Sequence, residues 1–197
     1  MTDSLNRLLK EVRACHICRD LPLGPKPILQ VGSSKVRLLI TGQAPGTRAH
    51  ETGITFNDPS GDRLREWMGI NRSLFYNDQL ISIIPMGFCY PGSYERGGDL
   101  PPRKECAPQW RAKLLKLLPD IELTLLVGSY AQNYVLGKGS LTERVKNFRD
   151  YLPNFLPLPH PSWRTRIWAK KNPFFETEVL PELKKRVCDI LNLDMKS

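Results

Sequence analysis

The feature that most constrains the fold is the alternation of short apolar runs with longer segments of helical spacing. The apolar runs, which read as buried strands, are residues 36–40, 79–86, 123–127 and 155–158. The segments with helical spacing are residues 62–68, 105–118, 130–136, 142–151 and 176–193. Strands that alternate with helices favour a parallel sheet covered on both faces. We therefore expect one domain, residues 1–197, built as a three-layer α/β/α sandwich around a small central four-stranded parallel sheet.

The order of these elements also predicts where a ligand binds. In open parallel sheets, ligands sit beyond the carboxyl ends of the strands. Two polar segments rich in Gly and Pro, residues 42–46 and 160–164, follow predicted strands directly. We expect them to meet at one rim of the sheet. A further helix is predicted at residues 4–12, with Ser4 as its N-cap.

The chain is basic, with 29 Lys and Arg against 20 Asp and Glu, which gives a formal net charge of +9. A basic surface attracts nucleic acid, and no amphipathic anchor favours lipid instead. The plainer alternative is a basic protein without a polyanion partner. The apolar runs are too short to span a bilayer, and the first residues do not resemble a secretory signal. We therefore expect a cytoplasmic monomer that binds nucleic acid and has no membrane partner.

The five cysteines are Cys15, Cys18, Cys89, Cys106 and Cys188. Structural disulfides are rare in cytosolic proteins. The first two form a C-x-x-C pair, and the next two flank an irregular loop rich in Gly and Pro, so all four thiols can reach one point. We call these four the paired cysteines. Four thiolates suit either zinc or a four-iron cluster. The alternative is scattered core cysteines with a chance C-x-x-C, and Cys188 in the closing helix has that interpretation.

Residues 42–46, Gly-Gln-Ala-Pro-Gly, resemble the first motif of the iron–sulfur branch of the uracil-DNA glycosylase superfamily, which reads G-E-A-P-G. In that branch a glycine follows eleven positions after the start of the motif and a phenylalanine fourteen after, as Gly53 and Phe56 do here. The second superfamily motif, H-P-S after the last strand, matches residues 160–162. The spacing of the branch's cluster ligands matches the paired cysteines. The resemblance runs from about residue 15 to residue 164.

This resemblance implies a DNA glycosylase that flips a deaminated base out of DNA and hydrolyses its N-glycosidic bond in base excision repair. The base would be uracil or a related one such as hypoxanthine. Phe56 would stack on it, Gly42, Gln43 and Ala44 would bind its edge, and His160 would stabilise negative charge on it as it leaves. The resemblance also implies a [4Fe–4S] cluster, in preference to zinc, on the paired cysteines. Because no lysine lies in either motif, we expect a monofunctional enzyme without a Schiff base.

Two positions depart from the family pattern. Gln43 replaces the acidic residue of the first motif, and an amide cannot act as a general base. Pro85 stands where the branch usually carries an asparagine that reads the uracil edge, and proline has no side-chain donor. The substrate is then a base other than uracil, or another group reads uracil. Asn57 is our candidate for that group.

Gln43 can still orient water or read a base edge. If a carboxylate acts in catalysis, Asp58 is the leading candidate because it is two residues from Phe56. The alternative is an Asp-Pro-Ser-Gly turn in which Asp58 or Ser60 caps the following helix. His50 and Glu51 are secondary candidates.

Residues 163–171 hold four cations, two tryptophans and no acidic residue. Beside a base-binding pocket, such a segment is typical of one that grips phosphates and stacks an aromatic ring on DNA. We predict DNA contacts from Ser162, Trp163, Arg164 and Arg166; the alternative is a solvated basic loop. At the level of the whole chain, two alternatives stay open. One is a weak or inactive DNA-binding member of the same fold, and the other is a zinc-stabilised enzyme that acts on free nucleotides.

Overall fold

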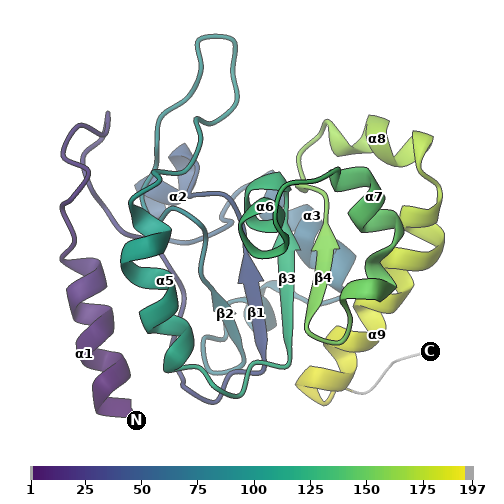
Figure 1. Cartoon of the computed structure of the whole chain (residues 1–197), viewed down its shortest axis with the longest axis horizontal. Coiled ribbons are helices and arrows are strands. Elements are labelled where there is room, and N and C mark those ends of the chain that lie inside the picture. The colour runs from purple at the N-terminus through teal and green to yellow at the C-terminus, as the bar shows by residue number, and fades with distance from the viewer. Residues whose placement is uncertain (1, 194–197) are drawn as a thin grey trace.

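The computed structural model describes residues 2–193 of the chain, and its centre is a sheet of four parallel strands (Figure 1). The strands are β1 (Leu38–Thr41), β2 (Ile81–Ile83), β3 (Leu123–Val127) and β4 (Phe155–Leu158), in the spatial order β2–β1–β3–β4. Leu39 of β1 lies in register with Ser82 on one side and Thr124 on the other. Pro157 lies in the edge strand β4, the position where a residue without an N–H is tolerated. The predicted four-stranded parallel sheet is confirmed.

Helices cover both faces of this sheet. They are α1 (Thr2–Arg13), α2 (Thr47–Thr52), α3 (Pro59–Met68), α4 (Arg72–Phe75), α5 (Cys106–Lys116), α6 (Ser129–Leu136), α7 (Leu141–Lys146), α8 (Thr165–Lys171) and α9 (Leu180–Leu191), with a 3₁₀ turn η1 (Phe148–Tyr151) and a π turn η2 (Phe175–Val179). None of the helices between residues 2 and 193 is long and apolar enough to cross a membrane.

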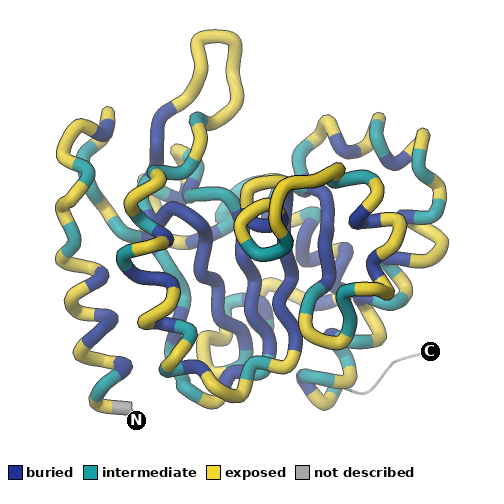
Figure 2. Tube along the Cα trace, viewed as in Figure 1, coloured by how far each residue is buried: buried dark blue, intermediate teal, exposed yellow. Residues whose placement is uncertain are grey.

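The three layers follow from the alternation of side chains along the strands. Leu38 and Ile40 of β1 point to one face, where they join a core with Leu64 of α3 and Val187 of α9. Leu39 points to the opposite face and packs with side chains of α1 and α5. Figure 2 shows the strands buried between these helices. The predicted α/β/α sandwich is confirmed.

Several boundaries differ from those predicted. Helix α1 begins at Thr2, so Ser4 lies inside the first turn and is not the N-cap. The second strand is confined to Ile81–Ile83, although the N–H groups of Ile84 and Met86, on either side of Pro85, still donate to the carbonyls of Ile40 and Gly42 at 2.9 Å. The segment predicted as one helix at 142–151 divides into α7 and η1. Helices α2, α4 and α8 were not expected, and α8 forms part of the basic segment whose plainer interpretation was a loop.

Candidate active site and cysteine cluster

A pocket opens at the carboxyl ends of β1, β2 and β4, and we call it the rim pocket. Its lining residues are Gly42, Gln43, Ala44, Pro45, Gly46, Ala49, Thr55, Phe56, Asp58, Ser60, Ile83, Pro85, Asp99 and His160. The two sequence motifs therefore meet at one rim, as predicted from the order of strands. His50 and Glu51 lie on α2 and are not among the described residues that line the pocket.

Phe56 is held rigidly in this pocket. Its backbone is left-handed, with φ 51°, and its carbonyl accepts a 3.0 Å hydrogen bond from the hydroxyl of Tyr76. A Cβ on Gly61 would lie only 1.7 Å from that carbonyl oxygen, so α3 can pass Phe56 only with glycine there. The ring meets Phe75 edge-on at 6.3 Å and packs against Gly42, where a Cβ would lie 3.0 Å from its Cζ. The aromatic face is thus fixed before any ligand arrives.

Gly61→Ala is expected to destabilise the protein by about 1–3 kcal/mol, because the added methyl forces Phe56 and α3 apart. Thermal melting of this variant beside Ser60→Ala, one position earlier in the same helix, measures the effect. Equal melting temperatures for the two variants would show that the close approach of Gly61 to Phe56 is not required.

Two carboxylates face the same part of the pocket. A Cβ on Gly46 would lie 3.3 Å from Oδ2 of Asp99 and 4.0 Å from Oδ2 of Asp58. The other oxygen of Asp58 accepts the N–H of Gly61 at 2.9 Å and caps α3. The capping interpretation of Asp58 is therefore confirmed, and the same side chain also lines the pocket.

Asp99 differs from Asp58 in its surroundings. Its outer side is open to solvent, while its carboxyl group lines the pocket. Desolvation raises the pKa of Asp99 and the charge of Asp58 raises it further, whereas a hydrogen bond from Ser93 and the nearby His160 lower it. The net result is that the pKa of Asp99 lies above its ordinary value.

His160 closes the pocket from the end of β4. Burial lowers the pKa of its imidazole, against the opposing pull of Asp58 and Asp99, so the neutral ring is favoured at neutral pH. The segment is anchored locally, because the hydroxyl of Thr165 donates to the carbonyl of His160. Arg63 of α3 donates to the carbonyl of Pro161 at 3.1 Å. A neutral imidazole fixed in this way can present an N–H to a group in the pocket.

Of the two side chains predicted to read the base, Gln43 lines the pocket and Asn57 does not. The Gln43 side chain donates to the carbonyl of Leu100 at 2.8 Å, so it holds a loop beside the pocket. Asn57 donates to Thr52 at 3.2 Å and accepts from Arg72 at 2.8 Å, and it is not among the described residues that line the pocket. Both outcomes arise from long-range partners that the sequence pattern did not reveal.

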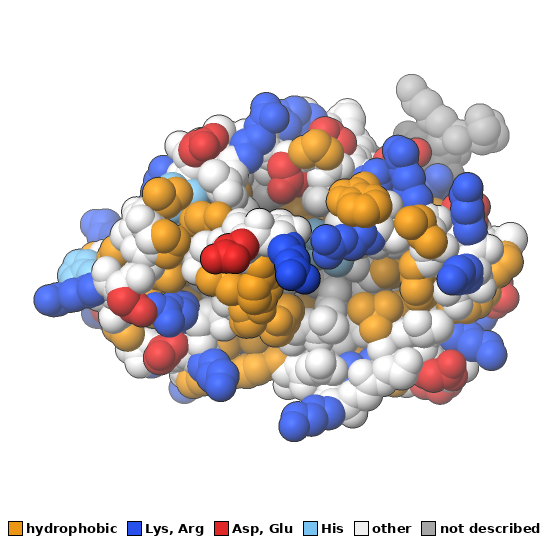
Figure 3. Space-filling view, turned by 90° about the horizontal axis from the view of Figure 1, so that it is seen from above, with side chains coloured by type: hydrophobic (Ala, Val, Ile, Leu, Met, Phe, Trp, Pro, Cys, Tyr) orange, Lys and Arg blue, Asp and Glu red, His pale blue; other side chains and the backbone are white. Residues whose placement is uncertain are grey.

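The basic segment lies directly after His160. Ser162 continues the chain from the rim, and the Trp163 side chain is 65% exposed. The guanidinium of Arg164 lies 5.5 Å from the centre of the Trp163 ring, and Arg166 is exposed on α8. Figure 3 looks onto this face of the molecule, over which Lys and Arg side chains are distributed. The segment thus presents an exposed aromatic ring, with cationic side chains around it, beside the rim pocket.

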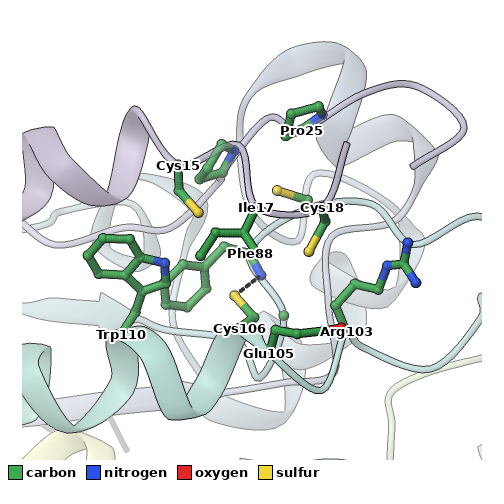
Figure 4. Close-up of a pocket in the computed structure, with 12 residues that line it drawn as sticks. Cys15, Ile17, Cys18, Pro25, Phe88, Arg103, Glu105, Cys106 and Trp110 are labelled. Atoms are coloured by element: carbon green, nitrogen blue, oxygen red, sulfur yellow. Dashed lines mark hydrogen bonds between the residues drawn. The ribbon is translucent and has the colours of Figure 1, made fainter. Parts of the chain in front are cut away.

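A second cavity is lined by all four paired cysteines, together with Ile17, Phe88, Trp110 and other residues. In Figure 4 Cys15, Cys18 and Cys106 lie around it, and the N–H of Phe88 donates to the Cys106 sulfur at 3.3 Å. The pKa of Cys89 is raised to about 11 and that of Cys106 to about 12, mainly by burial and in part by the neighbouring cysteines. Four thiols from three segments of chain are therefore close neighbours.

The chemistry of the four thiols bears on what this cavity can bind. Four thiolates suit either zinc or a four-iron cluster. The cavity is mostly apolar, and the sulfur of Cys106 accepts the N–H of Phe88. Within residues 2–193, no group of three or more His, Cys, Asp or Glu side chains lies close enough together to hold a metal ion. The donor set is thus one that both groups use.

A profile of the uracil DNA glycosylase superfamily matches residues 29–184 of this chain, which include every residue of the rim pocket. The chain belongs to the uracil DNA glycosylase superfamily. The solution NMR structure of a candidate uracil DNA glycosylase from Methanosarcina acetivorans is similar at 17% identity, with a TM-score of 0.45, and the match covers 81% of this chain and 99% of that one. Cys15 and Cys18 lie before the matched range, so the superfamily assignment does not depend on them.

Three polar residues of this superfamily member's pocket, Asp99, Thr55 and Ser60, were not predicted as pocket residues from the sequence. Asp99 lies in a glycine-rich loop far from both motifs, and only the folded loop brings it to the rim. Thr55 precedes the aromatic residue of the first motif, and its Oγ1 is buried without a hydrogen-bond partner among the described residues. A buried hydroxyl in that state costs about 1–3 kcal/mol. Its position beside Phe56 was visible in the sequence, but its burial was not.

Proposed function

We propose that this chain is a monofunctional DNA glycosylase that removes a deaminated base, uracil or a related base such as hypoxanthine, in base excision repair. The observation that carries the proposal is that Phe56, Asp58 and His160 line one pocket at the sheet rim of a superfamily member. An aromatic face, a carboxylate and a neutral histidine are the groups that binding and releasing a base require.

Base binding begins with extrusion, because an enzyme cannot reach the target bond inside a duplex. The fixed ring of Phe56 stacks on the flipped base, while residues 42–44 supply backbone contacts to its edge. The carbonyls of Gly42 and Gln43 already accept N–H groups from Met86 and Gly87 at 2.9 Å, so the contacts come from other backbone groups of this segment. The Thr55 hydroxyl can donate or accept, and this versatility suits either uracil or hypoxanthine.

Bond cleavage leaves an oxocarbenium-like sugar and an anionic base. The N–H of His160 stabilises the charge that grows on the base, where a preorganised donor has its largest effect. Asp58, which lines the same pocket, offsets the positive charge that develops on the sugar. No lysine is among the described residues that line the rim pocket, so the chain has no Schiff-base nucleophile there and water completes the reaction.

DNA contacts outside the pocket come from the basic segment. Arg164 and Arg166 neutralise phosphates, Ser162 lies at the pocket edge, and the exposed Trp163 ring stacks where the base has left the helix. Binding through these cations makes DNA affinity fall as salt rises.

The proposed cofactor is a [4Fe–4S] cluster, in preference to zinc, on Cys15, Cys18, Cys89 and Cys106, which line one cavity and match the ligand spacing of the iron–sulfur branch. The cluster would serve as a structural cross-link rather than as a reactant. Its ligands join the end of α1, the segment after β2 and the start of α5, and Cys89 and Cys106 flank the loop that contributes Asp99 to the rim pocket.

A panel of oligonucleotides tests the function. Each carries one modified base, uracil or hypoxanthine first, in single- and double-stranded form, and alkali reveals abasic sites. We expect strand cleavage only after alkali. Tight, salt-sensitive binding without cleavage for every base would indicate an inactive DNA-binding protein. Weak DNA binding with turnover of free nucleotides would indicate the zinc-stabilised alternative.

A further inference from the structure

The loop at residues 92–100 is a hairpin held by backbone hydrogen bonds rather than an irregular loop. Ser93 and Asp99 form an antiparallel bridge, the N–H of Leu100 donates to the carbonyl of Gly92 at 2.8 Å, and the N–H of Tyr94 donates to that of Gly98 at 2.9 Å. In Figure 1 it is the teal loop that projects beyond the carboxyl ends of the strands. Asp99 lies at its returning base, beside the rim pocket.

The first motif itself fixes this hairpin. Gln43, at the position where the family has an acid, donates its side-chain amide to the carbonyl of Leu100 at 2.8 Å. The residue held by this bond is the immediate neighbour of Asp99. Residues 42–46 contain no carboxylate. Through Gln43 they hold the hairpin that brings the carboxylate of Asp99 to the pocket.

The two pocket carboxylates, Asp58 and Asp99, differ in the hydrogen bonds that they already accept. Oδ1 of Asp58 is occupied by the Gly61 N–H, and it sits at the start of α3, where the helix dipole favours a fixed negative charge. Oδ1 of Asp99 accepts only the weak 3.2 Å bond from the Ser93 hydroxyl, and its Oδ2 faces the pocket near Gly46. Asp99 is therefore the better placed of the two to take up a proton.

We propose that Asp99 is the general base that activates the hydrolytic water, and that Asp58 acts as the fixed charge that stabilises the sugar cation. This assignment rests on the proposed glycosylase function. In the step, the C1′–N bond breaks and its electron pair leaves with the base, which is held by His160. The water oxygen bonds to C1′, and the water proton passes to Asp99. The products are an abasic sugar, an anionic base and a protonated Asp99, which returns its proton to solvent.

The pH dependence of the rate follows from the groups that face Asp99, which are Asp58, His160 and the hydroxyl of Ser93. Arg164 also approaches the hairpin, 3.9 Å from where a Cβ on Gly98 would lie. A base must be ionised, so the rate rises with pH through the pKa of Asp99, which lies above its ordinary value. Bound DNA would exclude water from its open side and move that pKa further upward. We call the fall in rate toward low pH the acid limb. Protonated His160 still has an N–H to donate, so its protonation does not cause this fall. The acid limb therefore reports the protonation of Asp99.

Single-turnover excision of the best substrate from the oligonucleotide panel, measured across pH, tests the assignment. Asp99→Asn is expected to lower the rate about 10²–10³-fold and to abolish the acid limb, while DNA affinity is retained. Asp58→Asn is expected to lower the rate but keep the acid limb. Asp99→Glu should restore part of the rate, because a carboxylate is again present.

Ser93→Ala is the matched comparison, since it removes the hydrogen bond that lowers the pKa of Asp99 but keeps the carboxylate. We expect its acid limb to move to higher pH, while the rate at high pH, where Asp99 is ionised, stays close to that of the unsubstituted protein. A Ser93→Ala variant that stays as slow as Asp99→Asn even at high pH would assign Asp99 a role in shaping the hairpin only. An acid limb that survives Asp99→Asn, or disappears in Asp58→Asn instead, would overturn the assignment. If the unsubstituted protein excises no base, the glycosylase function itself fails, and the assignment falls with it.

Discussion

Replacing His160 with alanine is expected to lower the single-turnover rate of base excision about 10²–10³-fold, the usual effect of removing one preorganised donor from a site of developing charge. The reason is the state of the ring, because burial lowers the pKa of His160 and keeps a neutral N–H donor in the pocket. The rate is measured with enzyme in excess, so that product release does not contribute.

His50→Ala is the control for this variant. His50 is also partly buried, and its ring packs 6.2 Å from that of Tyr90, but it is not among the described residues that line the rim pocket. We expect His50→Ala to retain most of the rate and His160→Ala to retain DNA binding. Equal losses in the two variants would indicate a general effect of losing a partly buried histidine rather than a role in catalysis.

Replacing Cys106 with serine is expected to remove the cluster and lower the melting temperature sharply. Cys106 begins α5 and accepts the N–H of Phe88, so the proposed cluster would tie this helix to the segment that follows β2. A loss of at least about 3 kcal/mol would lower the melting temperature of a domain of this size by about 6–12 °C. Anaerobic purification, iron and sulfide analysis and thermal melting measure the two effects.

Cys188→Ser provides the comparison, because Cys188 lies in α9 and its thiol donates to the carbonyl of Leu193 at 2.8 Å. That variant should keep the brown colour and the iron content of about four atoms per chain expected for the cluster. Stoichiometric zinc in the unsubstituted protein would contradict the cluster, and equal iron content in Cys106→Ser would contradict its ligand set.

The pattern of apolar residues along the chain predicted the sheet well, because each strand is a continuous run of mostly apolar residues. Residues 123–127 form a buried apolar run that became β3 with the same bounds, and 155–158 likewise became β4. Helix α8 was missed because cations dominate its sequence; its buried positions, Thr165 and Ala169, are small and only weakly apolar.

The candidate site was only partly predictable, for a different physical reason. The position of His160 follows from the end of the last predicted strand, and that of Phe56 from its spacing in the motif that resembles the superfamily. Those of Asn57 and Asp99 depend on contacts between distant segments. Asn57 is held by Arg72 outside the pocket, and Asp99 is brought to it by a hairpin that Gln43 fixes. A single sequence contains no pattern for such contacts.

The most direct test of the central claim is the mass spectrum of the products formed from uracil- and hypoxanthine-containing DNA before any alkali is added. The proposed chemistry predicts a free base and an unbroken strand with one abasic site, in equal amounts. Unchanged substrate with both bases, or a strand already broken without alkali, would contradict a monofunctional glycosylase acting on deaminated bases.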